Sequence, residues 1–251
     1  MRAAKAAVLP ALLLLLAEAG ARWHGASDSI APPSRIAVAF AGAFADGSLL
    51  RATGDTLATA FAGLAIGGGL GLVAGVGLGL SRVLDRLMEL PIELLRPVPS
   101  VAVIPIALVA LGFGYRLEIA IVSVACFWPL LILTRAAVAG VEPRLLEVAR
   151  ALRLPPLARV LKIVAPAALP RIFVAFRLAA GISLVVAVTV EIAVNPQGLG
   201  YELMTAGQAL RPELALAYLA WVAVVGFALN TGLVFAQERV FGAAARVSAP
   251  Q

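Results

Sequence analysis

Long uncharged stretches dominate the hydrophobic pattern of this chain, and shorter segments between them carry most of the charged residues. A helix needs about 20 mostly apolar residues to cross a bilayer. The pattern predicts about six such spans, at residues 6–20, 56–80, 98–114, 118–135, 172–194 and 214–237. These stretches are longer than the roughly ten-residue alternating strands of a membrane barrel. We therefore expect an all-α fold, a polytopic membrane helical bundle, in one transmembrane domain over residues 1–251.

The first predicted span has the weakest pattern of the six. Its apolar run ends at Glu18, and Arg2 and Lys5 precede it, which is also the arrangement found in a signal peptide. We expect a first helix that is not cleaved. Cleavage is the alternative, and it would leave five spans with the same orientation.

Composition narrows the class of protein further. The chain is 62% apolar and 14% charged, whereas soluble domains are about 45–50% apolar and about 25% charged. This excludes a disordered chain, which would be poor in apolar residues, and it indicates that lipid is the solvent. The formal net charge is +6. No dense basic tract with interleaved aromatic residues is present, so we expect no nucleic acid partner.

The basic residues predict the orientation of the chain in the membrane. Cytoplasmic loops of membrane proteins carry an excess of Lys and Arg. If the N-terminus is cytoplasmic, 15 of the 20 Lys and Arg residues lie in cytoplasmic segments, one of which is 81–97. We therefore expect both termini in the cytoplasm and a long cytoplasmic loop at residues 136–171.

Polar and small residues inside the spans are candidates for function. Thr189, Glu191 and Asn195 stand near the end of the fifth span, and they are candidates for a translocation path because an intramembrane carboxyl group is costly and often functional. A structural hydrogen bond between helices is the alternative for Glu191. The second span has glycines that recur every four residues, namely Gly63, Gly67, Gly71, Gly75 and Gly79. Such a ridge permits close helix packing within one subunit, and a moving interface or a dimer seam is the alternative.

The sequence offers no pattern for a metal site or a nucleotide site. His24 is the only histidine, and no cluster with metal-ligand spacing accompanies it. A phosphate-binding loop requires Gly-Lys-Ser or Gly-Lys-Thr, and neither Lys5 nor Lys162 stands in that sequence. We expect that the chain is not an enzyme and holds no cofactor. If ATP is used, another subunit binds it.

The predicted cytoplasmic loop is too long for a simple connection, because helix–helix connections usually have 2–8 residues and longer ones tend to be functional. From Pro143 onward, apolar and charged residues alternate at helical spacing. The apolar face has Leu145, Leu146, Ala149 and Leu152, and the polar face has Arg144, Glu147 and Arg150. This predicts a short amphipathic helix that Pro155 and Pro156 end. Such a helix either rests on lipid headgroups or docks into a cytoplasmic partner.

Residues of this loop resemble the EAA loop of ABC importer permeases. The family pattern is Glu-Ala-Ala-x3-Gly-x9-Ile-x-Leu-Pro, and the matching positions here are Glu147-Val148-Ala149, Arg153, Ile163 and Ala165-Pro166. Three further segments, Leu95–Pro105, Ala139–Glu147 and Gln197–Tyr201, resemble the nitrate/sulfonate/taurine-type branch of that family. Val148, Arg153 and Ala165 depart from the pattern. We expect Pro155-Pro156 to supply the break that the family glycine usually makes.

The resemblance implies a type I ABC importer permease fold in a bacterial inner (plasma) membrane. It implies two ATPase subunits that bind ATP and Mg, a second permease copy in a homodimer, an extracytoplasmic solute-binding protein, and contact with membrane lipid. It also implies the residues that couple the chain to the ATPase, which are Glu147, Val148, Ala149, Arg150, Leu152, Arg153 and Pro155.

The cargo implied by the resemblance is a small anion such as a sulfonate, taurine or nitrate, with pyrimidine-type precursors as an alternative. Without the resemblance, a secondary transporter or a non-transport membrane scaffold remain alternatives. A secondary transporter would show an internal repeat, and the sequence shows no convincing one.

Overall fold

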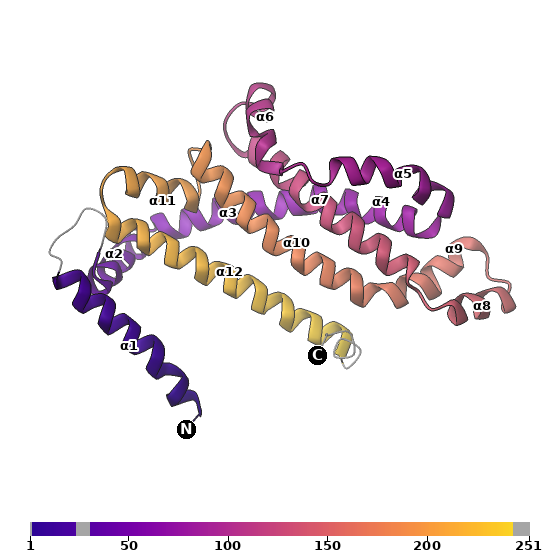
Figure 1. Ribbon diagram of the computed structural model, residues 1–251, viewed down its shortest axis with the longest axis horizontal. Coiled ribbons are helices and arrows are strands. Elements are labelled where there is room, and N and C mark those ends of the chain that lie inside the picture. The colour runs from indigo at the N-terminus through magenta and orange to yellow at the C-terminus, as the bar shows by residue number, and fades with distance from the viewer. Residues whose placement is uncertain (1, 24–30, 243–251) are drawn as a thin grey trace.

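The computed structural model describes residues 2–23 and 31–242, and helices make up nearly all of them (Figure 1). No strand occurs among these described residues. The longer helices are α1 (Arg2–Trp23), α2 (Pro33–Ala45), α3 (Ser48–Gly63), α4 (Gly69–Leu80), α5 (Arg82–Leu95), α7 (Tyr115–Ala139), α10 (Ala165–Ala193) and α12 (Pro212–Phe241). The shorter ones are α6 (Ile104–Leu111), α8 (Pro143–Ala151), α9 (Pro156–Arg159) and α11 (Leu199–Gln208). Single turns of other helix types lie at η1 (Leu64–Gly68), η2 (Ser100–Val103) and η3 (Val160–Val164).

The described helices confirm the predicted all-α membrane bundle. Four of them are long and apolar enough to cross a bilayer, namely Ser48–Leu80, Tyr115–Ala139, Pro156–Ala193 and Pro212–Val240. A fifth span exists if the pair Arg82–Leu95 and Ser100–Leu111 is counted as one broken span. Helix α1 covers the predicted first span, residues 6–20, but the crossing of the membrane by α1 stays a prediction.

The third predicted span, residues 98–114, does not form one straight helix. Helix α5 ends at Leu95, and residues 96–99 are not helical. The helical segment Ser100–Leu111 that follows makes an angle of 77° with α5. Pro97 and Pro99 explain the break, because proline has no backbone N–H and disfavours helical geometry in the residue before it.

The glycine ridge of the second span packs against α7. A Cβ atom added to Gly71 would lie 2.5 Å from the carbonyl oxygen of Phe127, and one on Gly75 would lie 2.6 Å from that of Leu131. Gly63, Gly67 and Gly79 meet α7 in the same way. By contrast, a Cβ on Gly69 would meet no atom within 4 Å. The ridge therefore serves close packing within one subunit, which is the first of the interpretations drawn from the sequence.

The ends of the molecule carry different elements. Figure 1 shows α8 and α9 at one end of the long axis and α2 and α11 toward the other. Helix α1 leans away from the bundle, and the C-terminal part of α1 contacts the start of α2 (Figure 1). There Ser34 donates hydrogen bonds to the Glu18 carboxylate from its backbone N–H, at 3.0 Å, and from its hydroxyl, at 2.7 Å.

Candidate functional site

Helix α8 projects from the end of the bundle where α7 and α10 approach each other (Figure 1). Pro143 stands in its first turn, where the fixed φ of proline suits a helix start. Ala149 is buried, and Leu146 packs against the cluster formed by Ala137, Val138, Val141, Val164 and Ala168. One side of α8 is therefore anchored to the protein, and the opposite side is free.

The free side of α8 presents apolar as well as charged groups. Val148 is 49% exposed and Leu152 is 64% exposed, and the four-residue spacing puts both on one face. The exposed residues Glu147 and Arg150 flank them. Nothing in the described part of the chain covers this face. We call Glu147, Val148, Arg150 and Leu152 the free face of α8.

The end of α8 corrects one expectation from the sequence. The helix ends at Ala151, before Pro155 and Pro156, and those two prolines begin α9 instead. Arg153 has a left-handed φ of 49°. The Leu154 N–H donates to the Ala149 carbonyl at 3.0 Å, and the Arg153 N–H donates to the Arg150 carbonyl at 2.9 Å. This pair of bonds is a Schellman motif, in which the left-handed position is usually glycine. Arg153 itself therefore makes the break that glycine makes in the family pattern.

A buried polar network lies at the opposite end of the bundle and contains two of the predicted path residues. Asn195 donates from Nδ2 to Glu118 Oε2 at 2.5 Å and accepts from the Gly114 N–H at 2.9 Å. Thr59 donates to the other oxygen of Glu118. Glu191 accepts from the Gly200 N–H at 2.8 Å. The network therefore joins α3, α7 and α10 to the segment after α10 and to the first turn of α11.

The three predicted path residues differ in their surroundings. Glu191 and Asn195 are both buried in this network. Thr189 donates to the Val185 carbonyl of its own helix at 2.7 Å and takes no part in the network. Sequence reasoning missed Glu118, because it is the first residue of a predicted span and follows Arg116, so that it resembled a charge at the membrane surface. His24 lies outside the described residues. Among those described, no group of three or more His, Cys, Asp and Glu side chains is placed to hold a metal ion.

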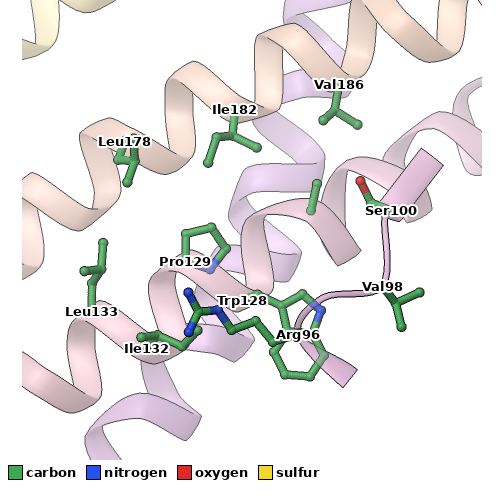
Figure 2. Close-up of a pocket in the computed structure, with 11 residues that line it drawn as sticks. Arg96, Val98, Ser100, Trp128, Pro129, Ile132, Leu133, Leu178, Ile182 and Val186 are labelled. Atoms are coloured by element: carbon green, nitrogen blue, oxygen red, sulfur yellow. The ribbon is translucent and has the colours of Figure 1, made fainter. Parts of the chain in front are cut away.

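A cavity of about 410 Å³ lies between the α5–α6 break, α7 and α10. Figure 2 shows Leu178, Ile182 and Val186 of α10 facing Pro129 of α7 across it. Arg96 lies at its edge, and Figure 2 shows the guanidinium reaching from the break toward α7.

A solved structure shares the fold of this chain. The crystal structure of an amino acid ABC transporter with histidines superposes with a TM-score of 0.66 at 17% sequence identity, over 80% of this chain and 98% of that one. The fold is therefore that of a type I ABC importer permease, as the sequence predicted.

Sequence comparison then gives the family. Residues 67–242 match the family described as binding-protein-dependent transport system inner membrane component, and the chain belongs to that family. It is 30% identical over 223 residues to the putative aliphatic sulfonates transport permease protein SsuC of Bacillus subtilis, covering 88% of this chain and 81% of that protein. It is also 30% identical over 193 residues to the nitrate import permease protein NrtB of Leptolyngbya laminosa, covering 77% and 66%.

Family membership confirms the main functional prediction. The chain is a membrane-embedded permease component of a binding-protein-dependent ABC transport system. Membership of this family supports the permease prediction and does not support the alternatives, a secondary transporter or a non-transport scaffold. The family is a transport permease and not an ATPase, so the system requires an ATPase and a solute-binding protein as separate components.

Proposed function

We propose that this chain forms the membrane path of an importer that moves a small oxyanion into the cell, and that α8 transmits the work of ATP hydrolysis to that path. The observation that carries the second part is the free face of α8. A helix at the end of the bundle that exposes Val148 and Leu152 beside charged groups has the surface expected for docking into another protein.

The docking residues follow from this face. Glu147, Val148, Arg150 and Leu152 contact the groove of an ATPase subunit, and Glu147 offers its charge to a basic residue there. Ala149 lies on the anchored side, so it supports the helix from beneath. Arg153 and Pro155 set the direction in which the chain leaves α8.

The assembly has a two-fold axis, with two copies of this chain around a central path and one ATPase subunit beneath each copy. ATP and Mg are held by the ATPase pair. Closure of that pair on ATP moves the two α8 helices and opens the path outward, and hydrolysis resets it. The chain itself lies in lipid and contributes no catalytic group.

In the orientation that we propose, α8 and both termini lie in the cytoplasm. Basic residues support this, because Arg144, Arg150, Arg153, Arg159 and Lys162 all lie in or next to α8 and α9. Figure 1 shows α12 running from α11 back toward the α8 end. An extracytoplasmic solute-binding protein then docks at the opposite end, near α2 and α11.

Glu191, Asn195 and Thr189 belong to the outward end of the path. Glu191 and Asn195 are held by a network that spans three helices, so the outward opening of this end has to rearrange or move that network as a unit. Thr189 lies close by on α10 with a part-exposed side chain.

The cargo is a small oxyanion, and the names of the relatives support this. SsuC of Bacillus subtilis is named for aliphatic sulfonates and NrtB of Leptolyngbya laminosa for nitrate, and both anions bear a compact negative head of several oxygens.

The test is uptake into proteoliposomes that contain the complete complex of permease and ATPase, with the binding protein outside and ATP inside. Labelled ethanesulfonate, taurine and nitrate are offered in parallel with a neutral pyrimidine. We expect accumulation of at least one anion only when ATP and the binding protein are both present. Accumulation of the pyrimidine alone would overturn the oxyanion assignment, and accumulation without ATP would overturn the coupling.

A further inference from the structure

The break between α5 and α6 lies about midway along the length of the bundle (Figure 1), and its residues 96–99 are exposed at the side of the described chain. Helix α5 runs back along α4 and α7, because Asp85 near its start pairs with Arg135 and Ile92 packs with Leu131. Arg96 follows one turn later and shares a cavity with Trp128, which is near the middle of α7. Arg96 belongs to the predicted cytoplasmic segment 81–97, whereas its side chain lines the same cavity as Trp128, near the middle of α7.

Arg96 has no partner at this depth. Among the described residues it makes no hydrogen bond or ion pair through its guanidinium. An unpaired arginine at the level of the hydrocarbon core is costly, and such residues usually mark a ligand or ion path. Irregular backbone at that depth is likewise tolerated only where it is covered by protein or lines a cavity. The break at residues 96–99 meets this condition, since Arg96 and Val98 line the cavity.

The rest of the cavity lining is apolar or uncharged. Among the residues that the structure describes, no Asp or Glu lines it, and beyond Arg96 its polar side chains are Ser100 and the indole of Trp128. The volume of about 410 Å³ is within the range of small-molecule sites. A single cationic group beside apolar side chains attracts an anion, and the attraction strengthens when the bound ligand displaces water and lowers the local dielectric. The flat guanidinium also matches two oxygens of an oxyanion at once.

Resting on the proposed function, we propose that the Arg96 cavity is an anion-binding site within the path, where the guanidinium receives the oxyanion head of the cargo and the side chains of α7 and α10 contact its apolar part. Discontinuous helices near the middle of the bilayer form binding sites in other transporters in the same manner.

The test measures the charge preference of the cavity without knowledge of the cargo. A Ser100→Cys variant of the complete complex, in lipid nanodiscs, is reacted with two methanethiosulfonate reagents of similar size. One carries an ethylsulfonate group and the other an ethyltrimethylammonium group. The native cysteine, Cys126, is fully buried and gives the background rate in the complex without Ser100→Cys.

We expect the sulfonate reagent to react faster than the ammonium reagent, and Arg96→Gln to lower that ratio about tenfold or more, since a nearby unit charge acts on both reagents in opposite directions. Arg96→Lys keeps the charge and should keep most of the ratio. Arg86→Gln is the matched control, because Arg86 is an exposed arginine of α5 that does not line the cavity, and it should leave the ratio unchanged.

An unchanged ratio in Arg96→Gln overturns the site, and it is also the result expected if a lipid phosphate already occupies the guanidinium. A lowered ratio together with no uptake of ethanesulfonate, taurine or nitrate would leave the anion site standing while it refutes the proposed cargo. A lowered ratio with anion uptake that Arg96→Gln does not reduce would show that the cavity is off the path, and would overturn the proposal.

Discussion

The contact between the glycine ridge and α7 predicts that glycines of one helix differ sharply in their tolerance of alanine. At Gly67, a Cβ would overlap the backbone of Ser123, which no change of rotamer can relieve. At Gly69, two residues further, a Cβ would meet no atom within 4 Å. Gly75 and Gly77 repeat the comparison two ridge positions later, with the Leu131 carbonyl 2.6 Å from a Cβ on the first and open space around the second.

The expected magnitude follows from two contributions. Replacing glycine by alanine in a helix gains about 0.5–1 kcal/mol at either position, so this gain cancels when Gly67→Ala is compared with Gly69→Ala. What remains is the cost of overpacking at Gly67, about 1–3 kcal/mol. For a chain of this size each kcal/mol corresponds to roughly 2–4 °C in Tm. Gly67→Ala should therefore melt about 2–12 °C below Gly69→Ala.

The assay is thermal unfolding of the detergent-solubilised protein, followed by the fraction that still elutes as a monodisperse peak after heating. Gly75→Ala and Gly77→Ala serve as the second pair. Equal Tm values within each pair would refute the packing argument. A lower Tm for Gly69→Ala than for Gly67→Ala, or for Gly77→Ala than for Gly75→Ala, would show that another subunit contacts the side of the helix opposite α7.

Three further perturbations test other parts of the structure. Arg153→Gly should raise stability by about 1 kcal/mol by relieving the left-handed φ, measured as slower amide exchange in α8; faster exchange would contradict the Schellman geometry. Asn195→Ala removes the donor to the buried Glu118 carboxyl group and should cost about 2–4 kcal/mol, read as a fall in Tm, whereas an unchanged Tm would show that the network is not formed. Arg135→Gln breaks the part-exposed pair with Asp85 and should cost less than about 1 kcal/mol; a larger loss of Tm would mean that the pair is shielded from water.

Much of the fold could be predicted because lipid imposes simple rules on the sequence. Long apolar stretches become helices, as α7 and α12 illustrate, since backbone polar groups must be satisfied within the segment. The short amphipathic helix α8 was also predictable, because Pro143 marks its start and the spacing of apolar residues marks its faces. The resemblance to the EAA loop pointed to Glu147 and Val148, which the structure leaves exposed, and to Ala149, which it buries.

The features that could not be predicted depend on contacts between distant segments. Glu118 appeared to be a surface charge, and only packing brings it to Asn195, which is 77 positions away. Arg96 appeared to be cytoplasmic because the reversal of α5 along α4 cannot be derived from hydropathy alone. The backbone of Arg153 was missed for a local reason. Two prolines stand next to it and explain a helix end equally well, so the left-handed residue gave no separate signal.

In the proposed mechanism, the ATPase acts on this chain through α8, and a charge reversal at Glu147 is the sharpest experiment on that coupling. The measurement is the rate of ATP hydrolysis by the reconstituted complex, with and without the solute-binding protein loaded with the transported anion. Glu238→Arg is the matched control, because Glu238 is an exposed glutamate at the end of α12, outside α8. We expect Glu147→Arg to insert normally into the membrane and to lose both the stimulation of ATP hydrolysis and the uptake, while Glu238→Arg keeps both. Wild-type stimulation and uptake in Glu147→Arg would contradict this coupling.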